Sequence, residues 1–558
     1  MSRWESLPQF SKDMYTEKYL KNGESWNDWA IKIAKKYSDD EEQANRIFSY
    51  LERGWFHPST PISSDRGYPI SCFTNDIEDT KKSIFDTWHE NNWLGAGGGG
   101  IGTDWSMVSE IGRKLSSGGK SSGTIPMIKV SDASSLAVSQ GGLRKASQAC
   151  YSVDSHPEIL DFINIRRPQG DPNRKSENIH HGIKLTDEFI EAVLSNDLWD
   201  LKSPHDYRVV KSLPAWELLK KIIISRMETG EPYLMFIDNV LRRLPKEYKD
   251  NNMTVKVSNL CTEIFLHTDR YNTGVCCLVS LNLKHYDEFK DNPQFFLDVH
   301  TFTDNVLTRF IEMAFNKEGY EKAVNSAVNE RSIGIGFMGY HDLLQSKMLP
   351  YGCLSANYLT KQIIDNVSKI FSLTNLKLAS EKGTAPISKT KRNVNVMAIA
   401  PTASISILNG LASQGIDPRI ANIYTAKTSI GSYTIRNEYL EKELDKIGMN
   451  TEKVWKSILE NTGSVQHLDI PQDLKDVFKT AFEIDQRDLV TAVAIMGEKV
   501  CQGISTNLFF PADSDYEYVL RTHILAWKLG LKSLYYVRSN ALARATISNL
   551  DRECLSCQ

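Results

Sequence analysis

A single thiol lies between an amide and a carboxylate in the stretch NLCTEIF, residues 259–265. Cys261 is two residues from Asn259 and two residues from Glu263. Alternate side chains of an extended segment project from one face, and the β-branched and aromatic neighbours in this stretch favour extended backbone. We therefore predict that residues 259–263 are extended and that the thiol, the amide and the carboxylate point to the same place. Such a site would combine a reactive sulfur with a candidate base.

Two more cysteines lie in stretches that resemble strands. Cys72 belongs to YPISCF and Cys276 to GVCCLVSLNL. A free cysteine inside a strand most often fills core space. Their spacing in the sequence does not show that the two thiols meet.

The chain ends with a CxxC pair, Cys554 and Cys557. This spacing is typical of a redox dithiol or of half a zinc site. The chain has no second CxxC to complete a zinc site, and the adjacent His180 and His181 are a poor substitute. A dithiol that carries reducing equivalents is the favoured interpretation, and we predict no metal site.

Small hydroxyl residues follow the apolar run VNVMAIA in the stretch APTASIS. Backbone N–H groups and hydroxyls at a junction between a strand and a helix can bind an anion. Thr402, Ser404 and Ser406 are therefore candidates to hold a phosphate. The run LGAGGGGIG, residues 94–102, matches a dinucleotide fingerprint only weakly, and close backbone packing or a turn is the simpler interpretation.

Adjacent tyrosines occur in SLYYVRS. In a strand, Tyr535 and Tyr536 would point to opposite faces, one into the core and one to the surface.

The elements that must position these residues follow from periodicity. Residues 1–55 have apolar residues at helical spacing and many charges, which predicts helices. From 56 to 540, runs such as CFTNDI, GIKL and YLMFID alternate with amphipathic stretches such as AWELLKKIIISRM. This alternation predicts an α/β fold with a largely parallel sheet. Residues 541–558 are polar, with little apolar periodicity, and are predicted to be a flexible tail.

Composition excludes several classes of protein. The 558 residues are 41% hydrophobic and 24% charged, with a net charge of −3, which argues against a protein that coats nucleic acid. The N-terminus lacks the apolar core of a signal peptide, and no apolar run approaches the ~20 residues of a membrane span. Nine cysteines, an odd number, do not suggest a secreted disulfide framework, so reduced thiols and a cytoplasmic location are expected.

Taken together, these stretches resemble the catalytic large (alpha) subunit of ribonucleotide reductase. The matching segments follow the family's order over nearly the whole chain: STPI, ISCF, GGGGIG, SQGGLRK, NLCTEI, CCLVSLNL, IGIGFMGYHDLL, APTASIS with GIDP, LYYVRS and CLSC. The resemblance implies a ten-stranded α/β barrel with a central finger loop, spanning 56–540. It also implies reduction of ribonucleotides, expected to be diphosphates, to 2′-deoxyribonucleotides for DNA precursor synthesis.

The resemblance assigns a role to each reactive residue. Cys261 would become a transient thiyl radical at the tip of the finger and remove the 3′ hydrogen of the ribose. Glu263 would accept the proton of the 3′ hydroxyl, and Asn259 would hydrogen-bond the ribose hydroxyls. Cys72 and Cys276 would supply two electrons and end as a disulfide.

Binding residues are also implied by the resemblance. The effector, a deoxynucleotide or ATP, would bind at a specificity site in the interface of a homodimer, with Asp79 and Thr80 at its start. Arg144 would belong to the loop that relays the identity of the effector to the substrate. The residues expected to bind substrate are Thr60, Ser71, Thr402, Ala403, Ser404 and Ile405.

The tyrosines distinguish the classes of the family. Tyr535 and Tyr536 match the stacked pair that passes a radical to the cysteine in class I enzymes, whose radical originates in a separate, metal-containing small (beta) subunit. No cofactor is then bound in this chain, and thioredoxin or glutaredoxin would re-reduce it through Cys554 and Cys557. A barrel that begins near residue 56 leaves no room for the N-terminal ATP cone of many members.

Three alternatives stay open. One is a class II enzyme that uses adenosylcobalamin and needs no small subunit. Another is an inactive paralogue that only binds nucleotides, although the intact set Cys72, Asn259, Cys261, Glu263 and Cys276 argues against it. The last is a thiol–disulfide oxidoreductase that uses CxxC alone, which would need neither a phosphate site nor so long a chain.

Overall fold

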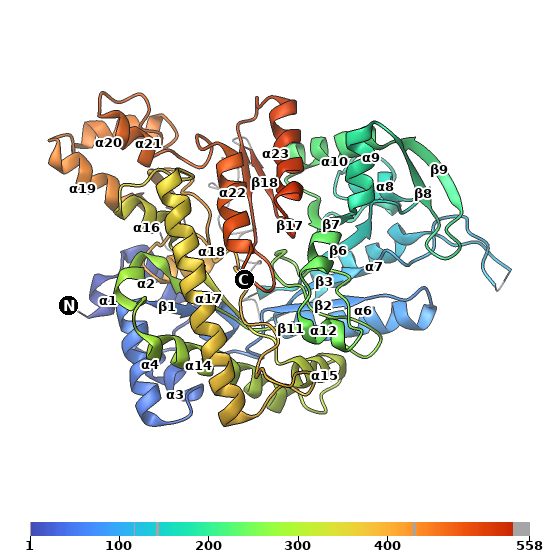
Figure 1. Cartoon of the computed structure of the whole chain (residues 1–558), viewed down its shortest axis with the longest axis horizontal. Helices are drawn as coiled ribbons and strands as arrows, with labels where there is room; N and C mark the ends of the chain where they lie inside the picture. Colours follow the sequence, from blue (N-terminus) through green and yellow to red (C-terminus); the bar gives the residue numbers. More distant parts are fainter. Residues whose placement is uncertain (1, 117, 141–143, 428–430, 540–558) are drawn as a thin grey trace.

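The computed structural model describes residues 2–116, 118–140, 144–427 and 431–539 (Figure 1). Its first part is helical, as the periodicity predicted. Ser25 and Asp28 form a capping box at the start of α3, whose buried face includes Trp29 and Ile33. The four helices of this region are α1 (Arg3–Ser6), α2 (Gln9–Lys18), α3 (Trp26–Lys36) and α4 (Glu41–Arg53).

The larger of two principal sheets has seven strands and curls as half of a barrel. Its order is β11 (Gly274–Cys276), β2 (Cys72–Asp76), β3 (Gly100–Asp104), β6 (Ser147–Val153), β7 (His180–Leu185), β10 (Tyr233–Phe236) and β17 (Ser533–Leu534). The five inner strands are parallel, whereas β11 and β17 are antiparallel to their neighbours. Strands β2, β3 and β10 are almost wholly buried, which accounts for the continuous apolar run YLMF of β10.

The second sheet has three strands, one of which follows a strand of the first sheet after a single residue. Cys277 separates β11 from β12 (Leu278–Asn282), which pairs in parallel with β13 (Gly334–Met338) and antiparallel with β1 (Phe56–Pro58). Beyond β13, isolated parallel bridges join Ile335 to Met397 and Ile399 to Ile504. The chain therefore passes from one sheet to the other next to Cys276.

The predicted α/β fold with a largely parallel sheet is confirmed. The strands occur as two sheets, and a single ten-stranded ring stays a prediction. The run VNVMAIA does not form a regular strand, because it makes only the isolated bridges at Met397 and Ile399. The remaining strands form short pairs: β4 (Ser139–Gln140) with β5 (Arg144–Lys145), β8 (Leu198–Lys202) with β9 (Val209–Pro214), β14 (Ile423–Lys427) with β15 (Ser432–Arg436), and β16 (Leu508–Phe510) with β18 (Val537–Ser539).

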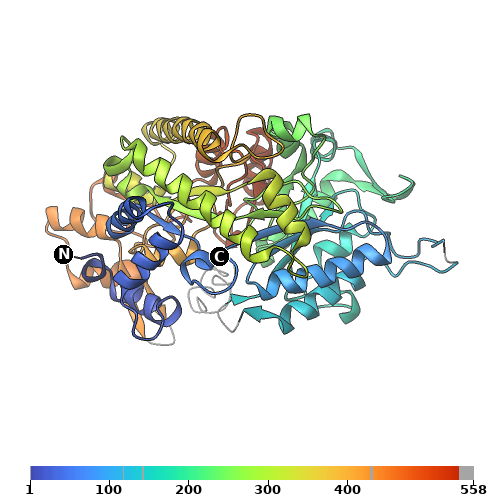
Figure 2. The same cartoon turned by 90° about the horizontal axis from the view of Figure 1, so that it is seen from below.

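Helices cover both sheets. The N-terminal helices lie at the end of the molecule opposite the β8–β9 hairpin (Figures 1 and 2). Phe302 of α14 meets Phe56 of β1, with ring centroids 5.9 Å apart, so this helix packs on the smaller sheet. The other helices are α5 (Thr60–Ser63), α6 (Lys81–Ala96), α7 (Thr124–Ala137), α8 (Ile159–Ile163), α9 (Asp187–Ser195), α10 (Ala215–Thr229), α11 (Ile237–Arg242), α12 (Lys246–Asp250), α13 (Tyr286–Phe289), α14 (Pro293–Ala314), α15 (Glu321–Glu330), α16 (Tyr340–Ser346), α17 (Leu354–Lys382), α18 (Ala403–Leu408), α19 (Glu438–Lys446), α20 (Glu452–Glu460), α21 (Gln472–Val477), α22 (Gln486–Gly497) and α23 (Tyr516–Lys528), with 3₁₀ turns at Pro172–Arg174 and Leu283–His285.

Candidate active site

The stretch around Cys261 is a buried turn, so the prediction of an extended segment is wrong. Residues 253–267 contain no regular helix or strand, and Thr262 has a left-handed φ of 66°. Asn259 stabilises the turn because its Oδ1 accepts hydrogen bonds from the backbone N–H groups of Glu263 and Ile264, each at 3.1 Å. The turn therefore closes the chain on itself and brings the amide of Asn259 to the backbone of Glu263.

A glycine lets this segment approach the large sheet. A Cβ atom on Gly102 of β3 would lie 1.8 Å from the carbonyl oxygen of Ser258 and 2.9 Å from Cα of Asn259. No side chain fits at such a distance. The glycine-rich run was interpreted as close backbone packing or a turn, and at Gly102 the close packing is confirmed. Tyr151 of β6 adds a hydrogen bond of 2.9 Å to the carbonyl oxygen of Asn259.

Cys72 and Cys276 lie directly opposite each other on neighbouring antiparallel strands, β2 and β11. Residues that face each other in this way have Cα atoms about 4.5–5.5 Å apart, which is within the range that a disulfide needs. Both cysteines are buried and reduced. Burial raises the pKa of the Cys276 thiol well above its usual range, so that thiol keeps its proton.

The turn contacts the cysteine pair. Nδ2 of Asn259 lies 3.1 Å from the sulfur of Cys72, and that sulfur lies 3.8 Å from Oε1 of Glu263. Ser505 donates a hydrogen bond to Oε2 of Glu263 at 3.1 Å and another to the carbonyl oxygen of Cys261. Sequence reasoning missed Ser505 and Tyr151, because neither lies near the turn in the sequence.

Glu263 has the character of a base. The side chain is 1% exposed, and burial raises its pKa to about 7 although hydrogen bonds from Asn259, Ser505 and Cys72 oppose the shift. A carboxylate with a pKa near the working pH is well suited to accept and return a proton.

The two tyrosines lie in a break between strands, so the prediction that they point to opposite faces is wrong. Strand β17 ends before Tyr535 and β18 begins after Tyr536, and the two ring centroids are 4.3 Å apart. The hydroxyl of Tyr535 lies 3.7 Å from the sulfur of Cys261. The phenols and the thiol thus form a continuous series that starts at the half-buried Tyr536.

The expected substrate residues lie at three places: Thr60 begins α5, Ser71 directly precedes β2, and residues 402–405 form the start of α18. The hydroxyl of Ser71, the residue before Cys72, is 2.9 Å from that of Ser59, and the hydroxyl of Thr60 is 3.0 Å from that of Tyr19. Trp29 of α3 donates a hydrogen bond of 2.7 Å to the carbonyl oxygen of Ser63 at the end of the same helix. The N-terminal helices therefore hold α5 in place.

Thr402 directly precedes a helix, as predicted, but the run before it makes only isolated bridges and is not the predicted strand. Thr402 has a left-handed φ of 56° and precedes α18, which begins with Ala403, Ser404 and Ile405. Its hydroxyl accepts a hydrogen bond of 2.6 Å from the N–H of Gly415. The first N–H groups of a helix have no acceptor within it and can meet an anion. The hydroxyl of Ser406, by contrast, donates to the carbonyl oxygen of Ala403 inside the helix.

Comparison with known proteins places this site in a family. The model of the ribonucleotide reductase barrel domain matches residues 70–389 and 387–537. The chain belongs to the ribonucleotide reductase family. It is 40% identical over 517 residues to a putative ribonucleoside-diphosphate reductase large subunit of Frog virus 3, with 91% of this chain and 90% of that protein aligned. The large subunit of Invertebrate iridescent virus 3 is 38% identical over the same shares of the two chains.

A solved structure agrees with these relatives. The class Id ribonucleotide reductase alpha subunit of Actinobacillus ureae superposes over the whole of both chains with a TM-score of 0.87 at 30% identity. The chain is thus a ribonucleotide reductase large subunit of the class I type.

Asp79 and Thr80, two of the three expected specificity residues of this reductase, line a pocket of about 660 Å³. Asp79 accepts a hydrogen bond from Ser109 and lies 2.8 Å from Nε2 of His205, while Thr80 caps the first turn of α6. Arg144 begins β5, which pairs with β4. Effector binding by these residues stays a prediction.

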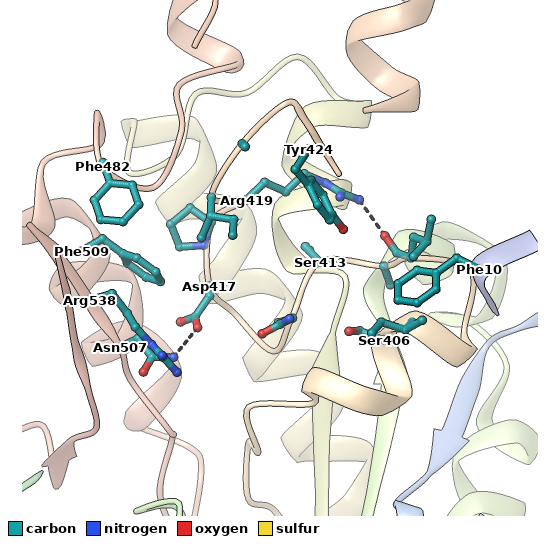
Figure 3. Close-up of a pocket in the computed structure, with 17 residues that line it drawn as sticks. Phe10, Ser406, Ser413, Asp417, Arg419, Tyr424, Phe482, Asn507, Phe509 and Arg538 are labelled. Atoms are coloured by element: carbon teal, nitrogen blue, oxygen red, sulfur yellow. Dashed lines mark hydrogen bonds between the residues drawn. The ribbon is translucent and has the colours of Figure 1, made fainter. Parts of the chain in front are cut away.

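A second pocket, of about 150 Å³, lies beside α18 (Figure 3). Its lining includes the rings of Phe10, Phe482 and Phe509, and it does not include the described reactive cysteines. Arg538 forms part of this lining, and its guanidinium also lies 4.4 Å from the ring centroid of Tyr536. The pocket is therefore separate from the thiols of the reductase but borders its tyrosine pair.

Three expectations concern the C-terminal cysteines, a metal site and a membrane span. Cys554 and Cys557 lie outside the described residues. Within the part of the chain that the structure describes, no group of three or more His, Cys, Asp or Glu side chains could hold a metal ion. Over the same residues, no helix is both long and apolar enough to cross a membrane.

Proposed function

We propose that this large subunit reduces ribonucleoside diphosphates to 2′-deoxyribonucleoside diphosphates, using a radical that a separate small subunit provides. One observation carries the proposal: the sulfur of Cys261 lies 3.7 Å from a tyrosine hydroxyl, and Glu263 of the same turn lies 3.8 Å from the sulfur of Cys72. A thiol that only filled core space would need neither neighbour.

In this mechanism, Tyr535 takes the hydrogen atom of Cys261, and the thiyl radical removes the 3′ hydrogen of the ribose. Glu263 accepts the proton of the 3′ hydroxyl, which assists loss of the 2′ hydroxyl as water. Cys72 and Cys276 then provide two electrons and become a disulfide. Their position on paired strands supports this last step, because a bond between them needs no backbone movement.

The barrel supplies the frame for these steps. We infer that the two sheets, joined at Cys277 and extended by the bridges at Ile399 and Ile504, form one ten-stranded barrel around the turn at Cys261. The substrate diphosphate would meet the first turn of α18, with Thr60 and Ser71 on the other side. A deoxynucleotide or ATP would bind near Asp79 and Thr80 at a homodimer interface and select the substrate, with Arg144 in the relaying loop.

The tail would connect the site to a reductant. We propose that Cys554 and Cys557 exchange with the Cys72–Cys276 disulfide and are then reduced by thioredoxin or glutaredoxin. The class II alternative, in which adenosylcobalamin forms the thiyl radical, loses support because Tyr535 and Tyr536 lie in contact and end at Cys261.

The decisive assay measures dCDP formation from CDP by the purified chain alone, with a candidate small subunit, and with adenosylcobalamin. We expect product only with the small subunit, and none from Cys261→Ser. Cys353→Ser is the matched control, because Cys353 is a half-buried thiol at the start of α17 and should retain activity. Product with adenosylcobalamin alone would assign class II, and turnover by Cys261→Ser would contradict the thiyl mechanism.

A further inference from the structure

His180 lies at the outer end of the tyrosine pair. Its Nδ1 is 3.3 Å from the hydroxyl of Tyr536, and its ring stacks on Tyr233 with centroids 6.0 Å apart. Tyr233 in turn contacts both tyrosines, with centroid distances of 4.7 Å to Tyr535 and 5.0 Å to Tyr536. The imidazole is therefore held at the phenol that the radical reaches first on its way to Cys261.

A buried ion pair sets the charge around this imidazole. Nδ1 of His180 is 2.6 Å from Oε1 of Glu231 and 2.7 Å from Nη1 of Arg166, and those two groups are 2.8 Å apart. Burial alone would raise the pKa of Glu231, but Arg166, His180 and His181 hold that pKa well below its ordinary value. Glu231 is therefore an anion beside His180.

The position of the proton follows from these contacts. When Nδ1 carries no proton, its one lone pair can accept from Arg166 or from Tyr536. When Nδ1 is protonated, it donates to the carboxylate of Glu231. The site thus offers His180 a hydrogen-bonding partner in each of its two states.

The positive charge of Arg538 requires that oxidation of Tyr536 be accompanied by loss of its phenolic proton. Its guanidinium lies 4.4 Å from the ring centroid of Tyr536. A positive charge on that face disfavours a tyrosine cation radical, so the electron cannot leave the ring unless the phenolic proton leaves as well.

We propose that His180 is the proton acceptor for oxidation of Tyr536. One electron passes from Tyr536 to the oxidised radical residue of the small subunit, the phenolic O–H bond breaks, and the proton moves to Nδ1 of His180. Tyr536 becomes a neutral phenoxyl radical, which takes a hydrogen atom from Tyr535 and, through it, from Cys261. When the electron returns after turnover, His180 gives the proton back.

The test is a single-turnover assay by rapid quench, with the small subunit, from pH 6 to 9. His180→Gln keeps hydrogen-bonding groups but cannot accept a proton, so it should slow deoxynucleotide formation by at least tenfold and by roughly 10²–10⁴ if no other base replaces it. In His180→Gly, added imidazole should restore part of the rate. His181→Gln is the control: it also contacts Glu231, at 3.1 Å, but its other ring nitrogen faces the carbonyl oxygen of Ile163. It should keep the pH profile of the unsubstituted protein and show no response to imidazole.

Removal of the neighbouring anion tests the same conclusion without removing the histidine. Glu231→Gln takes away the carboxylate, 2.6 Å from Nδ1, to which the protonated imidazole would donate. This variant should also slow deoxynucleotide formation in the single-turnover assay.

The inference rests on the proposed function and falls with it if the unsubstituted protein forms no product. If the unsubstituted protein is active and His180→Gln stays within twofold of its rate, the role of His180 is overturned and the proposed function is not. The role of His180 is also overturned if a folded His180→Gly shows no response to imidazole. Should neither His180 variant fold, a rate in Glu231→Gln within twofold of the unsubstituted protein would overturn it.

Discussion

The surroundings of Glu263 affect its pKa in two opposite ways. Its carboxyl group is almost fully enclosed, yet it has a thiol and a serine hydroxyl as neighbours. Enclosure favours the neutral acid, and the hydrogen bonds favour the anion, so the group titrates near neutrality. A base of this kind can take a proton early in a reaction and return it later.

Replacement of Glu263 by Gln should therefore remove catalysis and keep the fold. We expect turnover to fall by roughly 10²–10⁴, the usual contribution of a general base. In the unsubstituted protein, the acid limb of the kcat/KM profile should lie near pH 7. A Glu263→Gln protein with more than half of the normal rate would show that another group is the base.

The same substitution should stabilise the protein at high pH. The folded state holds Glu263 at a pKa of about 7, above the ordinary value of 4.5, so its stabilising contribution is complete below about pH 4.5 and is lost as the pH rises through 7. Gln stays neutral and does not incur this loss. Urea unfolding at pH 4.5 and pH 8 should show the variant gaining up to about 3 kcal/mol over the unsubstituted protein. An equal difference at both pH values would contradict the assigned pKa.

At the scale of elements, the sequence was a good guide to regular structure and a poor one to its interruptions. Long periodic segments such as α10 and α14, and buried runs such as β10, follow from local patterns. The turn at Cys261 depends on backbone hydrogen bonds that the side chain of Asn259 accepts, and the break at Tyr535 depends on partners far along the chain. Alternation of side chains carries neither signal, so both were predicted as extended. Cys72 and Cys276 lie opposite each other because of the register between β2 and β11, which the local sequence pattern does not predict.

Close approach of β3 to the turn gives a prediction for Gly102. The methyl group of Gly102→Ala would overlap the carbonyl oxygen of Ser258 and push the turn away from the sheet. We expect turnover to fall by at least tenfold and the melting temperature to fall as well. Gly119→Ala is the matched control, because no atom lies within 4 Å of a Cβ at that position. Equal activity of the two variants would show that the turn can shift without loss.

At the scale of the whole molecule, the reaction needs groups that three regions bring together. The larger sheet holds one cysteine of the pair on each of two strands, the turn holds the third thiol, and the segment after β17 holds the tyrosines. The N-terminal helices support α5, and the chain beyond the tyrosines continues into β18, which ends at Ser539.

Re-reduction should depend on that C-terminal segment. The double variant Cys554→Ser/Cys557→Ser should complete about one turnover from the pre-reduced enzyme and then stop with thioredoxin, because no carrier reaches the buried pair. Dithiothreitol, a small dithiol, should restore part of the steady-state rate. Normal turnover with thioredoxin would exclude these cysteines as the shuttle, and failure of the first turnover would give them another role.

The register of Cys72 and Cys276 has a mechanical consequence. A disulfide between them would tie the edge strand β11 to β2 and close a loop of about two hundred residues, which by chain entropy alone restricts the unfolded state by about 5 kcal/mol. Each catalytic cycle would then form this cross-link and reduce it again. The oxidised enzyme would unfold at a higher temperature than the reduced enzyme. Its thermal stability would therefore report the fraction of molecules that have turned over and await reduction.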